Sequence, residues 1–256
     1  MFGIVKRLRR RRLRRQPFPA AWRAIAERNL PFYRRLGDDD RRELERLIVI
    51  FIAEKSFEGC GGQGIDDEVR VTVAGQACLL LLRRDADVYP RLDVILVYPT
   101  AVMVEREEHE GVIVRAGRRI HLGESWTRGM VILAWDHVLS GARVGNDGAN
   151  VTLHELAHQL DAEDGAMDGT PQLEGGARYR SWAKVFSAEY DALKATLRRG
   201  KRSDIDAYGA TNEPEFFAVV TEMFFEKPTA LRRRHPELYD ELRAFYRQDP
   251  ASWPRR

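Results

Sequence analysis

Two histidines and a glutamate stand close together in the segment His154-Glu155-Leu-Ala-His158. Four residues of an α-helix turn through about 400° and rise about 6 Å, so His154 and His158 lie on one face, one turn apart. Two imidazole nitrogens placed in this way can bind one tetrahedral zinc ion at roughly 2.0–2.1 Å. Glu155 is offset around the helix, where it can act on a water rather than on the metal. The spacing therefore predicts a catalytic site with one zinc ion per chain.

The simpler alternative is a helix that carries two ordinary histidines. The apolar residues of the same segment are typical of a buried helix: Val151, Leu153, Leu156, Ala157 and Leu160. Histidines in such surroundings need a polar reason to be buried. We therefore favour metal binding over the simpler alternative.

Spacing alone leaves the third metal ligand open, because several carboxylates compete for it. Asp164 stands where a longer zinc-protease pattern has a third histidine, but the glycine that lets the chain turn back is absent. Glu215 and Glu222 lie about two turns apart on one face of a later apolar segment. Each of them can instead cap a helix or form a salt bridge. Asp161, one turn after His158, is predicted to support the site rather than to bind the metal.

Length and composition favour a globular protein. The chain has 256 residues, of which 44% are hydrophobic and 32% charged, enough for one large domain or two modest ones. Cys60 and Cys78 are too few for a disulfide framework and do not form a CxxC pair. No apolar run approaches the length of a membrane span, and no apolar signal segment follows the basic start. We therefore expect a reduced, cytoplasmic protein with no transmembrane segment.

Basic residues are concentrated at the start of the chain. Residues 1–15 hold eight lysines and arginines and no acid, so subtracting them from the net charge of +3 leaves −5 for the rest. Residues 1–16 also contain apolar side chains, and one interpretation is a short amphipathic helix that binds anionic lipid or nucleic acid. We favour a mobile, solvated tail, because blocks of like charge repel. Direct nucleic-acid binding is not expected, because no aromatic-interleaved patch or helix-turn-helix signal is present.

The apolar periodicity predicts a mostly helical chain with one small sheet. Helices are expected over residues 19–53 with breaks at Pro31 and Gly37, from Asp66 or Asp67 to Arg83, and over 150–161, 177–197, 215–226 and 236–246. Strands are expected at residues 94–98, 112–114, 119–122 and 130–135. Loops are expected at residues 59–64, 105–110, 141–149, 164–177 and 199–213. For the segment after Asp67, a strand remains the rival because of its β-branched residues.

These elements indicate an α+β fold in four parts. Residues 1–16 form a basic tail, 17–89 a mostly helical N-terminal subdomain, 90–248 a catalytic domain and 249–256 a C-terminal tail. Three further histidines lack metal-ligand spacing and are expected to be structural or exposed: His109, His121 and His137.

The chain resembles the Mlc titration factor A family of zinc peptidases in five segments: Asp67–Leu80, Gly123–Trp126, His154–Asp161, Tyr208–Val219 and Thr221–Phe225. The likeness covers most of residues 20–245. The metal site alone also resembles the catalytic domain of anthrax lethal factor.

The resemblance implies His154, His158 and Glu215 as zinc ligands, Glu155 as general base and Tyr208 as hydrogen-bond donor to the developing oxyanion. It also implies a zincin-like, gluzincin-type fold in which the small sheet packs against the metal helix, and an intracellular bacterial location. The implied activity is hydrolysis of peptide or protein substrates, with aminopeptidase action as one form of it.

Some members of this family bind the repressor Mlc and so relieve repression of sugar-uptake genes. The resemblance therefore implies a transcriptional repressor as a further partner. The alternative function is a non-catalytic regulatory protein that titrates such a repressor. The intact Glu155 argues against that alternative, because a structural zinc site is closed and needs no base.

Overall fold

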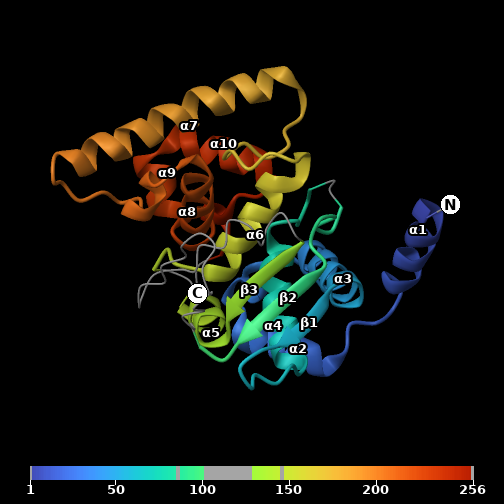
Figure 1. Cartoon of the computed structure of the whole chain (residues 1–256). Helices are drawn as coiled ribbons and strands as arrows, with labels where there is room; N and C mark the ends of the chain where they lie inside the picture. Colours follow the sequence, from blue (N-terminus) through green and yellow to red (C-terminus); the bar gives the residue numbers. More distant parts are fainter. Residues whose placement is uncertain (1, 85–86, 101–128, 145–146, 255–256) are drawn as a thin grey trace, which may run out of the picture.

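The computed structural model describes residues 2–84, 87–100, 129–144 and 147–254 (Figure 1). Three short parallel strands form the sheet of this part, in the order β1 (Ser56–Gly59), β2 (Val94–Tyr98) and β3 (Met130–Ala134). Ile95 of β2 pairs with Val131 of β3, and both side chains are buried. The expected strands at β2 and β3 are confirmed, whereas β1 was missed because Ser-Phe-Glu-Gly has no strong strand signal.

The helices before β2 pack around α4 (Asp67–Leu79). This helix contacts α2 (Ala20–Asn29) and α3 (Asp38–Glu54). Asp66 caps α4, because its side chain accepts a hydrogen bond from the backbone N–H of Val69 at 2.9 Å. The helix is therefore confirmed over the rival strand, and its β-branched residues serve as core on nearly all sides.

The chain passes from β3 directly into α5 (Trp135–Val144) and then into α6 (Val151–Asp161). Asn150 caps α6, since its side chain accepts a hydrogen bond from Leu153 N at 3.0 Å. The loop expected at residues 141–149 is wrong in its first part, which belongs to α5. Gly141 explains the difference, because a Cβ at that position would lie 3.1 Å from the Cα of Asn150. The glycine serves close packing rather than a turn.

Four helices complete the fold: α7 (Gly175–Arg198), α8 (Glu213–Glu226), α9 (Pro228–Arg234) and α10 (Pro236–Tyr246). Short 3-10 helices occur at Pro31–Arg35 (η1), Ala162–Asp164 (η3), Ala207–Ala210 (η4) and Pro250–Ser252 (η5). In Figure 1, α6 lies between the sheet with its helices and the group formed by α7 to α10. It contacts α4, α5, β3 and α8. The expected helices near α6, α7, α8 and α10 are confirmed, and α9 was missed.

The basic N-terminal segment differs from the mobile tail that the sequence favoured. Residues Phe2–Leu13 form helix α1, which contacts α3. Acidic residues of the body offset part of the like-charge repulsion, since Lys6 pairs with Asp87 and Arg10 with Glu54. These partners are distant in sequence, so composition alone did not reveal them.

Apart from Ala134, the described buried hydrophobic residues from Phe18 to Tyr246 form one cluster, in a mostly helical α+β fold with a small sheet. β1 lies in the same sheet as β2, and the division of the chain at residue 90 stays a prediction.

Among the helices of the described residues, none has the length and apolar character needed to cross a membrane. Several expected features lie outside the described residues: strands 112–114 and 119–122, the loop 105–110, His109, His121 and the segment Gly123–Trp126.

Candidate metal centre

Helix α6 brings His154 and His158 together as the four-residue spacing predicts. Both side chains are buried, at 2% and 0% exposure. Their rings meet edge to face with centroids 4.8 Å apart, and their Nε2 atoms are 3.2 Å apart. The Nε2 atoms of the two buried histidines thus lie close enough to contact the same ion.

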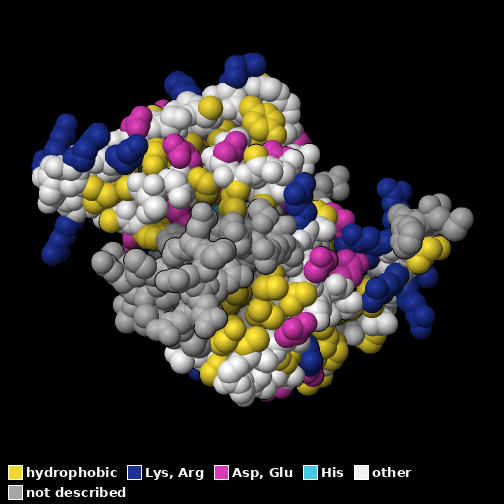
Figure 2. Space-filling view, in the orientation of Figure 1, with side chains coloured by type: hydrophobic (Ala, Val, Ile, Leu, Met, Phe, Trp, Pro, Cys, Tyr) yellow, Lys and Arg dark blue, Asp and Glu magenta, His cyan; other side chains and the backbone are white. Residues whose placement is uncertain are grey.

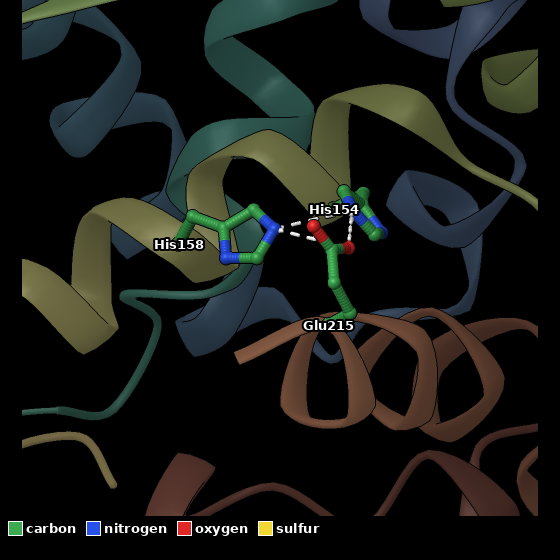
Figure 3. A group of neighbouring side chains, drawn as sticks. All are labelled: His154, His158 and Glu215. Carbon is green, nitrogen blue, oxygen red and sulfur yellow. Dashed lines mark hydrogen bonds and ion pairs between the residues drawn. The ribbon is translucent and has the colours of Figure 1, made fainter. Parts of the chain in front are cut away.

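Glu215 reaches the same place from the first turn of α8. Asn212 caps that helix and accepts a hydrogen bond from Glu215 N at 2.9 Å, which fixes where α8 begins. Oε2 of Glu215 lies 3.0 Å from Nε2 of His154 and 3.5 Å from Nε2 of His158 (Figure 3). The three side chains form a buried group of potential metal ligands within the described part of the chain.

The distances among these three atoms fit a tetrahedral metal ion. Ligand atoms at 2.0–2.1 Å from such an ion lie roughly 3.3–3.4 Å from one another. The observed edges of 3.0, 3.2 and 3.5 Å scatter around that value. Two imidazoles and one carboxylate are also a donor set that zinc commonly takes in open sites. The residues present therefore fit a metal ion.

Glu222 contacts the other nitrogen of His154. Its Oε1 lies 2.7 Å from Nδ1 of His154, and its Oε2 accepts a hydrogen bond from Asn150 N at 2.5 Å. Because a carboxylate accepts, Nδ1 is the donor, and in the neutral ring the lone pair of Nε2 then faces Glu215. A cation among these electron-rich atoms is favourable, whereas one proton satisfies a single pair of them.

Glu226 extends this network to the start of α6 and was not among the site residues predicted from the sequence. Its Oε1 accepts a hydrogen bond from Asn150 Nδ2 at 3.1 Å, and its Oε2 accepts from Gly148 N at 2.9 Å. Burial raises the pKa of the Glu226 carboxyl to about 8. The sequence signal was available, since Glu222 and Glu226 are four residues apart on an apolar helix.

Asp161, which is predicted to support the site, is fully buried. Its Oδ2 accepts a hydrogen bond from Gly169 N at 2.9 Å, and burial raises its pKa to about 7. Gly169 has φ +80°, and a Cβ there would lie 2.6 Å from the carbonyl oxygen of Glu213, at the start of α8. Asp161 thus ties the end of α6 to the chain beside the first turn of α8. Asp164 is exposed and is not part of the described ligand group.

The two remaining candidates for chemistry are Glu155 and Tyr208. Glu155 follows His154 on α6 and is 6% exposed. Tyr208 lies in η4 and is half-buried, with its ring centroid 6.0 Å from that of His154. Asp206 caps η4 and accepts a hydrogen bond from Tyr208 N at 2.8 Å. His137 is exposed on α5, in agreement with the prediction that it is structural or exposed.

Known proteins resemble this chain over almost all of its length. An uncharacterized protein of Synechocystis sp. is 44% identical over 244 residues, which cover 94% of this chain and 89% of the relative. Mlc titration factor A of Serratia proteamaculans is 30% identical, with 83% of each chain covered. Mlc titration factor A of Cronobacter sakazakii is 28% identical, with 91% of this chain and 87% of the relative covered.

The chain also matches a family model whose description names an activity. Residues 5–247 match the family model of the glucose-regulated metallo-peptidase M90. That range includes the buried group formed by His154, His158 and Glu215. The chain belongs to the glucose-regulated metallo-peptidase M90 family.

Proposed function

We propose that this chain is a zinc-dependent peptidase with a zincin-like fold. The observation that carries the proposal is the convergence of two Nε2 atoms and one carboxylate oxygen within 3.5 Å of one another in a buried site. His154, His158 and Glu215 would hold one zinc ion, which supplies a Lewis acid that polarises the carbonyl and lowers the pKa of water. Membership of a metallopeptidase family supports this assignment.

In the proposed reaction, Glu155 acts as general base and then as general acid. Its carboxylate accepts a proton from water while the water oxygen forms a bond to the peptide carbonyl carbon. The same carboxyl then gives this proton to the leaving nitrogen as the C–N bond breaks. The position of Glu155 beside His154 on a rigid, buried helix supports this role.

Tyr208 is proposed to stabilise the oxyanion that forms on the former carbonyl oxygen. A phenol hydroxyl is a hydrogen-bond donor, and such donors act most strongly where water is excluded. The closeness of its ring to His154 supports this role.

The proposed substrates are peptides or proteins. Aminopeptidase action is one form of this activity, and a peptide library would distinguish it from internal cleavage.

The variant Glu155→Gln tests the proposal, because it keeps the shape of the side chain and removes the base. We expect it to retain stoichiometric zinc by elemental analysis and to lose hydrolysis of a mixed peptide library. Glu213→Gln is the matched control, since Glu213 is an exposed glutamate at the start of α8. Full activity in Glu155→Gln would remove the general-base role. A wild-type protein that binds no zinc would overturn the metal assignment.

The names of the relatives favour a second function. Two of them are called Mlc titration factor A, and each is covered over more than four-fifths of its length. We propose on this basis that the chain also binds a transcriptional repressor of the Mlc type. Pull-down of such a repressor with Glu155→Gln separates the two functions, because binding alone survives the loss of the base. Repressor binding by a wild type that cleaves no peptide would favour the non-catalytic alternative.

A further inference from the structure

Helix α1 has two chemically different faces. Toward the body, Lys6 Nζ lies 2.8 Å from Asp87 Oδ2. Arg10 donates two hydrogen bonds to the carboxylate of Glu54, at 2.7 and 2.6 Å. Leu13 packs against the hydrophobic core. This face holds α1 on the body, and acidic residues offset its charge.

The opposite face combines exposed apolar side chains with cations. At about 100° per residue, Leu8 lies opposite Lys6 and Arg10. Val5 is 62% and Leu8 61% exposed, and among the described residues only Tyr179 joins them as an exposed large hydrophobic side chain. The arginines around this pair are exposed, and their side chains have no ion pair or hydrogen bond within the described chain: Arg7, Arg11, Arg12 and Arg15. Figure 2 shows hydrophobic atoms beside lysine and arginine atoms on this helix.

This combination is typical of helices that lie in the interface of a membrane. Each cation near an anionic lipid surface strengthens binding by about fivefold, so four uncompensated arginines are worth several hundredfold. Residues 16–256 carry a net charge of −5, so an anionic surface repels the body while it attracts the basic N-terminal segment. The charge distribution thus gives the contact one defined orientation.

We propose that α1 binds an anionic phospholipid bilayer, with its arginines at the headgroup phosphates and with Val5 and Leu8 directed toward the acyl chains. The contacts of Lys6 and Arg10 with the body then hold the folded protein at the membrane surface. A nucleic acid fits this face less well. Its phosphates attract the arginines equally, but exposed Val5 and Leu8 contribute nothing to a phosphate backbone.

Co-sedimentation with vesicles tests this proposal on the full chain. We expect binding to phosphatidylcholine vesicles that contain phosphatidylglycerol, weakened by salt, and at least tenfold weaker binding to phosphatidylcholine alone. The double variant Val5→Gln/Leu8→Gln keeps the charge and good helix formers, and we expect about tenfold weaker binding. Both side chains are exposed, so an unchanged thermal unfolding temperature verifies that the body is intact.

Two triple variants with equal changes in net charge separate a local contact from a general charge effect. Arg11→Gln/Arg12→Gln/Arg15→Gln, in and just after α1, is expected to weaken vesicle binding about a hundredfold. Arg198→Gln/Arg199→Gln/Arg202→Gln, at exposed positions near the end of α7, is expected to leave it nearly unchanged.

Three outcomes overturn the proposal. The first is an equal effect of the two triple variants, and the second is unchanged vesicle binding in Val5→Gln/Leu8→Gln. The third is an absence of vesicle binding together with DNA or RNA binding that survives Val5→Gln/Leu8→Gln, which identifies a nucleic acid as the partner.

Discussion

Nδ1 of His154 lies 2.7 Å from Oε1 of Glu222, on the side of the imidazole that faces away from Glu215. Two carboxylates from one helix thus contact opposite nitrogens of one ring. Because Glu222 also accepts a hydrogen bond from Asn150 N, it fixes both the ring and the start of the helix that carries it. This arrangement separates the role of a metal ligand from that of a residue that orients a ligand.

This relationship predicts different effects for the two glutamates. Glu215→Ala is expected to abolish measurable zinc binding, because it removes one of three ligand atoms. Glu222→Ala is expected to lower zinc affinity about 10- to 100-fold, the usual cost of losing a carboxylate behind a histidine ligand. Competition with a chromophoric chelator measures both affinities, and circular dichroism verifies folding. The reverse order of effects would make Glu222 the third ligand.

Tyr208→Phe removes a single hydroxyl beside the proposed metal site. We expect kcat to fall about 10²- to 10³-fold, as when one oxyanion donor is lost, with zinc content and KM little changed. Tyr190→Phe is the matched control, because its hydroxyl donates only a long hydrogen bond of 3.4 Å to the carbonyl oxygen of Ala210. An unchanged kcat in Tyr208→Phe would exclude it as the oxyanion donor.

The histidine pair was predictable from sequence because both residues lie on one short helix. The proposed third ligand was not predictable from spacing, because Glu215 and Glu222 share a face of α8 and each contacts a nitrogen of His154. Which nitrogen each one meets depends on how α8 packs against α6. That packing is set by contacts across the core, and the family resemblance supplied what the spacing left open.

Secondary structure was predictable from the sequence where apolar periodicity is strong. The prediction failed where a segment is held by residues from another part of the fold. Three glycines in residues 141–149 indicated a loop, yet Gly141 lies in α5 because Asn150 packs directly against it. Like charges indicated a mobile N-terminal tail, yet Glu54 and Asp87 pair with residues of α1. A prediction from neighbouring residues in the sequence cannot include a contact that forms only when the chain folds.

Gly169→Ala is expected to destabilise the fold and weaken zinc binding together. Gly169 combines φ +80° with a position where a Cβ would lie 2.6 Å from the carbonyl oxygen of Glu213. Gly200 is the matched control, because it has φ +67° but nothing within 4 Å of its Cβ position. Gly200→Ala should therefore cost only the left-handed strain, about 1–2 kcal/mol.

Gly169→Ala should cost more than this, because a backbone atom at the start of α8 must also move. Chemical denaturation of both variants measures the difference in free energy of unfolding, and chelator competition measures zinc affinity. Equal losses in the two variants would show that the contact with Glu213 contributes nothing.

The buried Asp161 makes stability depend on pH in a defined direction. Burial raises its pKa in the folded protein to about 7, against about 3.9 in an unfolded chain. The folded state therefore holds this proton more tightly than the unfolded state. The contribution of Asp161 to stability is fully present below about pH 4 and is lost as the pH rises toward and through 7.

Asp161→Asn removes this titration while its amide oxygen still accepts the hydrogen bond from Gly169 N. The variant should match the wild type near pH 4 and exceed its free energy of unfolding at pH 8, by roughly 4 kcal/mol at most at 1.36 kcal/mol per pKa unit. Denaturation of both proteins from pH 4 to 8 measures the difference, in which effects common to both proteins cancel. Asp240→Asn, at an exposed position of α10, is the control and should follow the wild type. Parallel curves for Asp161→Asn and the wild type would contradict the prediction, because they would show that Asp161 binds its proton equally in both states.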